Sequence, residues 1–117
     1  MTMESDLTTV LKTVCVRVYP DVAPSNAALP YITYQHIGGT ALRYVANNPA
    51  SIRHSRMQIN AWSATRAEAL TLIRAIEEAL CAASAFTARP ESEPIGDMDE
   101  DSDRRACIQD FEIWSPR

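Results

Sequence analysis

The sequence predicts an α+β fold in which two helices pack on one face of a mostly antiparallel sheet. Two stretches carry apolar residues at helical spacing, and between them lies a stretch in which apolar and polar residues alternate. Helical stripes and an alternating strand bury their apolar sides best against each other. With 117 residues, 46% of them hydrophobic and 22% charged, the chain is long enough for one core, and we expect residues 1–117 to form a single domain.

The first helix is expected over about residues 3–15. Its apolar residues fall at i, i+3, i+4 and i+7, the spacing of one helical face, and they are Leu7, Val10, Leu11 and Val14. The stretch "VRVYP" then predicts a short strand that ends at Pro20, whose missing N–H cannot continue a ladder. The segment "DVAPSNAALP" is a loop by its proline, serine and asparagine content.

Two further strands are expected in the middle of the chain. "YITYQHI" is rich in β-branched and aromatic residues, and the glycines at 38 and 39 after it predict a bulge or a bend. A turn is expected at residues 47–49, "NNP". In "SIRHSRMQINAWS" Met57, Ile59 and Ala61 alternate with polar residues and Trp62, which is the clearest strand signal in the chain.

The second helix is expected over about residues 65–84. Thr65 followed by Glu68 predicts a capping box. In this motif the Thr65 side chain accepts the Glu68 backbone N–H, and the Glu68 side chain accepts the Thr65 backbone N–H. The residues expected to point at the sheet are Leu70, Ile73, Ile76 and Leu80. Residues 85–103 are polar and acidic and predict a flexible loop or hairpin, and "RRACIQDFEIW" predicts the last strand.

Charge is distributed unevenly along the chain, although the formal net charge is only −4. From residue 22 to residue 67 there is no acid, and four arginines give this basic middle a formal charge of +4. Residues 91–112 contain nine acids and two arginines, a formal charge of −7. The chain therefore combines a basic middle with an acidic end.

No motif predicts catalysis or a cofactor. The three cysteines are widely spaced without a CxxC pair and suit buried free thiols, and His36 and His54 lie apart with no nucleophile or third ligand near them. No glycine-rich phosphate motif, apolar leader or membrane-spanning run is present. We therefore expect a non-enzyme in the cytoplasm with no cofactor and no membrane partner.

The acidic segment resembles a calcium loop in part. Asp97, Asp99, Asp101 and Asp103 occupy positions 1, 3, 5 and 7 of such a loop. Position 6 is Ser102 where a glycine is needed, and position 12 is Ile108 where a bidentate glutamate belongs. We expect a solvated hairpin tip without metal, and a surface that meets a basic partner is the alternative.

The basic group of Arg43, Arg53 and Arg56 has three interpretations. Arginines interleaved with Tyr44 and His54 could contact nucleic acid, but the acidic net charge argues against that, and no sequence-specific nucleic-acid binding is expected. A solvated strand edge and a protein interface remain open.

Several segments, taken in order, resemble the phage and prophage tail completion family, which includes tail-to-head joining proteins. They are the first amphipathic helix, "RVYPDVAP", "ALPYITYQHIGG", "RMQINAWSATRAEA" and "QDFEIW", and together they span about residues 4–114. Each segment alone is unspecific, but their order and spacing are distinctive. The resemblance is weakest over residues 85–103, where this chain is unusually acidic, and it gives no guidance there.

The resemblance implies a tail terminator or head-tail joining protein with no catalytic residues. Such proteins are small, α+β and monomeric when free, and they close as a ring, expected to be a hexamer, on the tail tube protein and offer a surface to the head connector protein. The protein is then expected in the neck of the virion, after assembly in the host cytoplasm. The hypothetical subunit interface pairs basic with acidic residues: Arg43, Arg53 and Arg56 against Asp97, Asp99, Asp101 and Asp103. The alternative is a small regulatory module that binds a protein through its acidic loop.

Overall fold

Two long antiparallel strands, β3 (Ile52–Ser63) and β6 (Arg104–Pro116), form the centre of the sheet. The computed structural model describes residues 2–41, 52–99 and 104–116. The pairing of β3 with β6 runs over the whole of β3, with Met57 opposite Phe111 and Ala61 opposite Cys107. Successive side chains of a strand point to opposite faces of the sheet. The odd-numbered residues point to the buried face, from 55 to 63 in β3 and from 107 to 115 in β6.

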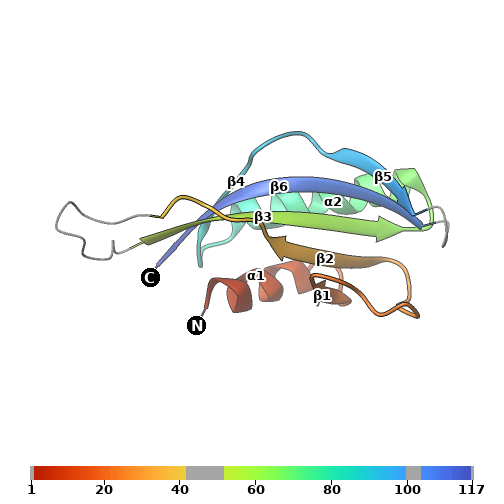
Figure 1. Ribbon diagram of the computed structural model, residues 1–117, viewed down its shortest axis with the longest axis horizontal. Helices are drawn as coiled ribbons and strands as arrows, with labels where there is room; N and C mark the ends of the chain where they lie inside the picture. The colour runs from red at the N-terminus through yellow and green to blue at the C-terminus, as the bar shows by residue number, and fades with distance from the viewer. Residues whose placement is uncertain (1, 42–51, 100–103, 117) are drawn as a thin grey trace.

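Four shorter strands complete the six-stranded sheet. β2 (Tyr31–His36) pairs antiparallel with β3, and β1 (Val18–Pro20) pairs parallel with β2. On the other side, β4 (Thr87–Pro90) and β5 (Ile95–Asp99) both pair antiparallel with β6. The order is β1-β2-β3-β6-β4, and β5 lies beside the first half of β6 (Figure 1). The predicted α+β class with a mostly antiparallel sheet is confirmed.

Helices α1 (Met3–Lys12) and α2 (Arg66–Ala82) cover the same face of this sheet and share one core with it (Figure 1). Leu7 and Leu11 of α1 are fully buried and belong to the same core as the apolar odd-numbered residues of β3 and β6. Burial of each such side chain contributes roughly 1.5–3 kcal/mol. α1 ends three residues earlier than expected, at Lys12, and Val14 and Cys15 still pack on the core from the turn that follows.

The buried stripe of α2 confirms three of the four expected residues. Ile73, Ile76 and Leu80 are fully buried, whereas Leu70 is only partly buried and Ala69 occupies the central position in its place. The reason is helical geometry: 69, 73, 76 and 80 follow one row at i, i+4, i+7 and i+11, and residue 70 lies about 100° further round the helix. Leu70 therefore packs at the margin of the core.

The start of α2 has half of the predicted capping box. The Thr65 hydroxyl accepts the Glu68 N–H at 3.2 Å, as expected of an N-cap residue. The Glu68 carboxylate accepts a hydrogen bond of 2.6 Å from the hydroxyl of Ser63, the last residue of β3. The second contact thus joins the helix to the strand before it.

Residues 85–103 contain regular structure that the sequence did not predict. Phe86 is buried, and β4 and β5 extend the sheet from β6. β5 and β6 pair as antiparallel neighbours, and the residues that join them, 100–103, lie outside the described part. Flexibility of this segment stays a prediction.

The expected bulge is formed by Ile37 and Gly38, directly before Gly39. The Ile37 N–H donates to the Arg56 carbonyl at 2.9 Å and the Arg56 N–H donates to the Gly38 carbonyl at 2.8 Å, so two residues of one strand face one of the other. Both glycines have positive φ, 113° and 144°. The expected turn at residues 47–49 lies outside the described residues.

The three cysteines are free, but they are not all buried. Cys15 and Cys107 lie in the core, whereas Cys81 is exposed on the outer side of α2. The expectation of buried thiols was therefore wrong for Cys81. The helix buries one stripe of residues that includes Leu80, and residue 81 is turned about 100° away from it.

Candidate functional site: the open face of the sheet

The sheet face that neither helix covers, called the open face below, carries the even-numbered residues of β3 and β6. These side chains are half-buried, and most are polar or aromatic: His54, Arg56, Gln58, Asn60, Trp62, Ile108, Asp110, Glu112 and Trp114. A sheet packed on one side only presents such a row to solvent or to a partner. The open face is therefore a structured surface that a partner could contact.

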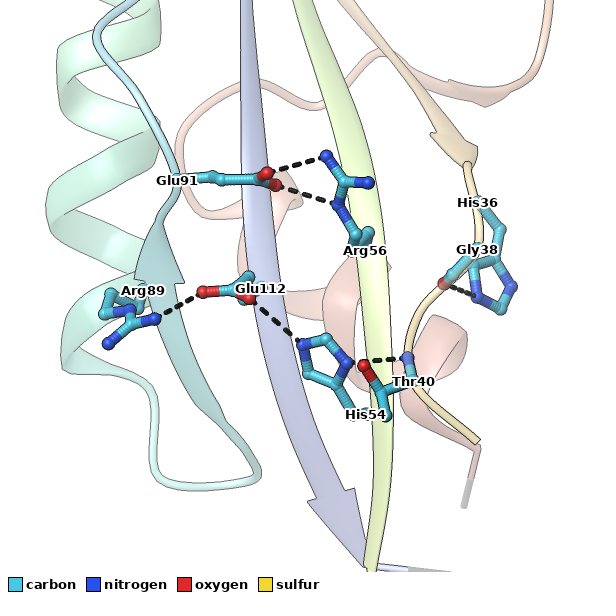
Figure 2. Close-up of polar contacts among 8 residues, drawn as sticks. All are labelled: His36, Gly38, Thr40, His54, Arg56, Arg89, Glu91 and Glu112. Atoms are coloured by element: carbon cyan, nitrogen blue, oxygen red, sulfur yellow. Dashed lines mark hydrogen bonds and ion pairs between the residues drawn. The ribbon is translucent and has the colours of Figure 1, made fainter. Parts of the chain in front are cut away.

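A bidentate ion pair joins β3 to the segment after β4. The Arg56 Nε and Nη2 donate to the two carboxylate oxygens of Glu91 at 2.9 and 2.6 Å (Figure 2). Hydrogen bonding to this carboxylate, together with its charge, raises the pKa of Arg56 above its ordinary value. Arginine stays protonated at any physiological pH, so the consequence is geometric: Arg56 is held in one orientation across β6.

A second chain of contacts crosses β4, β6 and β3 in one row. The Arg89 Nη2 donates to Glu112 Oε2 at 2.6 Å, and Glu112 Oε1 lies 3.4 Å from His54 Nε2 (Figure 2). The hydrogen bond from Arg89, followed by the charges of Arg89 and His54, lowers the pKa of Glu112. Glu112 is therefore ionised throughout the physiological range.

The His54 ring has a defined tautomer in this row. Its Nδ1 accepts the Thr40 backbone N–H at 2.8 Å, so in the neutral ring the proton is on Nε2 and faces Glu112. The ring holds the chain beyond the bulge against β3. His36, on the neighbouring strand, donates from Nε2 to the Gly38 carbonyl at 2.9 Å (Figure 2). Both histidines are hydrogen-bonded, as the sequence interpretation expected.

Both tryptophans of the chain lie on the open face, at opposite ends. Trp114 packs against His54 at 5.0 Å between ring centroids, and the Arg89 guanidinium lies 5.4 Å from its centroid. Trp62 stacks on Tyr31 at 6.0 Å. Aromatic and arginine side chains held in place by neighbours are typical of protein interfaces.

The second aromatic cluster also contains Arg104. Its Nη1 donates to the Tyr31 hydroxyl at 2.8 Å, and its Nη2 donates to the Ser25 carbonyl at 2.9 Å. The guanidinium lies 5.5 Å from the Tyr31 ring centroid. This arginine therefore fixes the loop before β2 to the start of β6.

Arg53 and Arg56 do not form one surface. Arg56 lies on the open face, whereas Arg53 has the opposite parity in β3 and lies on the helix side, exposed, near the start of α1. Arg43, the third member of the predicted basic group, lies outside the described residues.

Two of the four predicted acidic residues can be placed. Asp97 is exposed on β5, opposite Ala106, and its carboxylate accepts the Met98 N–H at 2.8 Å. The backbone of Asp99 pairs with Arg104. Asp101 and Asp103 lie outside the described residues. The role of all seven residues as a subunit interface stays a prediction.

The arrangement of Arg56, Glu91, Arg89 and Glu112 was missed from the sequence. Their pairing depends on register between strands that are distant in the chain. The sequence did contain one signal about the arginines themselves. Residues 53 and 56 are an odd number apart, so within one strand their side chains point to opposite faces.

The described residues contain no group of three or more histidine, cysteine or acidic side chains placed to hold a metal ion. No helix among them is both long and apolar enough to span a membrane. What the open face offers is hydrogen-bonding, charged and aromatic contact area.

Aromatic and arginine side chains on an uncovered sheet face are typical of surfaces that bind other proteins. The sequence model of the tail completion protein gp17 family matches residues 2–115, and the chain belongs to this family. No curated protein matches the chain significantly. The protein is thus a phage tail assembly protein, a component of the virion tail that contacts other tail and head components.

Proposed function

We propose that this protein closes the end of the phage tail tube as a ring of identical subunits, expected to be six, and that the ring presents a surface to the head connector. The observation that supports this most is the match to the tail completion family over residues 2–115. Ring closure requires a heterologous contact, in which one patch of a subunit meets a different patch of its neighbour.

The distribution of charge supports a contact of this kind. Arg53 lies in β3 nine residues before Trp62. Trp62 pairs with Ala106 of β6, and Ala106 pairs with Asp97 of β5. At about 3.3 Å per residue, the basic and acidic positions are roughly 30 Å apart, at opposite ends of the sheet. They cannot neutralise each other within one subunit, but they can do so between successive subunits.

The test combines purified tail tubes with the protein and follows them by electron microscopy. Tubes should acquire a ring at one end, and further addition of tube protein to that end should stop. The control is the same tube preparation without the protein, which should continue to lengthen. Tubes that lengthen equally with and without it, and carry no added density, would refute the capping function.

A further inference from the structure

A polar hollow lies on the helix side of the sheet, between the first residues of α1 and the ends of β2, β3 and β6. Its volume is about 460 Å³, and its walls include Arg53, Ser55, Ser115, His36 and residues 2–4. Here the core face of β3 and β6 changes from apolar residues to the two buried serines, which are 6% and 4% exposed.

Ser115 has an unused hydrogen-bonding group at the hollow. Its Oγ is buried and has no hydrogen-bond partner in the described part of the chain. A buried hydroxyl without a partner destabilises the fold, so a ligand atom that accepts its proton gains from binding there.

The other groups around the hollow favour an anion. α1 has ten residues and begins here, and its first N–H groups have no partner within the helix apart from that of Ser5, which donates to the Thr2 hydroxyl at 3.1 Å. The helix dipole adds positive potential at this end. Arg53 is exposed and forms no ion pair with any described residue.

One acidic side chain opposes this preference. Glu4 lies in the first turn of α1 and also lines the hollow. It is exposed, so its carboxylate can turn toward solvent when an anion enters, but it weakens the attraction. His36 is the other titratable group among the described residues that line the hollow, and its Nε2 donates to the Gly38 carbonyl.

We propose that this hollow is a carboxylate-binding site and that its occupant is an acidic side chain from the β5 strand of a second copy. This inference rests on the proposed ring. β5 carries Asp97 and Asp99 and no cation, and Asp97 is exposed. Since this segment and Arg53 lie at opposite ends of the sheet, a head-to-tail neighbour brings them together, with the Arg53 guanidinium, Ser115 and the helix N–H groups receiving the carboxylate.

The first test uses acetate as the carboxylate and NMR of the free protein as the readout. Acetate should shift the amide signals of Ser115 and residues 3–4 in a saturable manner, with sodium chloride at equal ionic strength as control. Arg53→Met should weaken binding about tenfold or more, and Glu4→Gln should strengthen it about twofold or more. Shifts no larger than those in chloride, or unchanged in Arg53→Met, would overturn the site.

The second test is a charge exchange measured by capping of tail tubes. Arg53→Glu should reduce the capped fraction about tenfold, as should Asp97→Arg combined with Asp99→Arg. Combining all three changes should restore capping to within about threefold of the parent. Arg74→Glu, on the exposed side of α2, is the matched control and should leave capping unchanged.

The outcomes of the two tests separate the two proposals. If Arg53→Glu caps as well as the parent, or if the combined variant is no better than its components, a second copy does not occupy the hollow. If the parent itself does not cap tubes, the ring and the occupant fail together, and the acetate titration alone decides whether the hollow binds carboxylates. Thermal melts of each variant exclude loss of folding as the cause.

Discussion

At the scale of single residues, Glu112 connects three strands through two different partners. Arg89 on β4 donates to one carboxylate oxygen, and His54 on β3 lies near the other. Both partners favour the ionised carboxylate, which is why the pKa of Glu112 is lowered. A group with a lowered pKa in the folded state contributes stability above its unfolded pKa, and that contribution is lost as the pH falls through the folded pKa.

Replacing Arg89 with glutamine should raise the pKa of Glu112 toward its ordinary value, because the hydrogen bond that lowers it most is lost. The measurement is an NMR titration of the Glu112 side-chain carboxyl carbon. Arg74→Gln on α2 is the control and should leave the titration unchanged. An unchanged pKa in Arg89→Gln would mean that the ion pair does not persist in solution.

Gly39 is the residue whose backbone allows β2 and β3 to approach beyond the bulge. Its φ is 144°, and a Cβ built there would lie 2.3 Å from the His54 carbonyl oxygen. Gly39→Ala should therefore lower the free energy of unfolding by about 1–3 kcal/mol in urea denaturation. Gly96→Ala is the control, because nothing lies within 4 Å of its Cβ position and the change should stay within about 0.5 kcal/mol. Equal losses would contradict the close approach.

At the scale of elements, helix α2 gives the sharpest stability prediction. Leu80 is fully buried, and Leu80→Ala should lower the free energy of unfolding by about 2–5 kcal/mol. Leu70→Ala is the matched control: it removes the same atoms from a partly buried position and should cost clearly less. Urea melts of both variants measure the difference. A loss below about 0.5 kcal/mol for Leu80 would mean that another face of the helix is buried.

The elements that the sequence predicted are those whose own periodicity records their burial. In β3 the alternation of Met57 and Ile59 with polar residues identifies a half-buried strand, and Ile73 and Ile76 identify a helix in the same way. β4 and β5 carry no such pattern because they are short edge strands held by β6. Gln109 of β6 also holds the segment between β4 and β5: its amide donates to the Ser92 carbonyl at 2.9 Å and to Glu77 of α2 at 2.8 Å.

The candidate site was less accessible from the sequence than the fold. The uneven charge was visible, but grouping Arg53 with Arg56 ignored the period of two, which places them on opposite faces. The partners of Arg56 and Arg89 are 35 and 23 residues away along the chain. Contacts at such separation are set by register, which no local pattern contains.

At the scale of the whole molecule, the two faces of the sheet differ in the kinds of side chain that they carry. The helix side holds the core, and the open face holds paired charges and aromatic rings. Because Arg56 and Arg89 are already neutralised by Glu91 and Glu112, an added partner on the open face gains little from their charge. Among the described side chains, Arg53 at one end of the sheet and Asp97 at the other form no ion pair, and we propose that these two ends drive assembly.

This separation leads to a prediction about salt that follows from the proposed ring. The free protein should sediment as a monomer, because copies that meet at random also bring their acidic ends together, and a tube end is needed to align them. Raising sodium chloride from about 0.1 M to about 1 M shortens the Debye length from roughly 10 Å to roughly 3 Å, and it should lower the capped fraction of tubes measured by electron microscopy. Arg53→Met should cap less at low salt and lose most of this dependence, since the contact that salt screens has been removed. Capping by the parent that is equal at both salt concentrations would place the ring contact on apolar surface, and the charged ends of the sheet would then face solvent or the head connector.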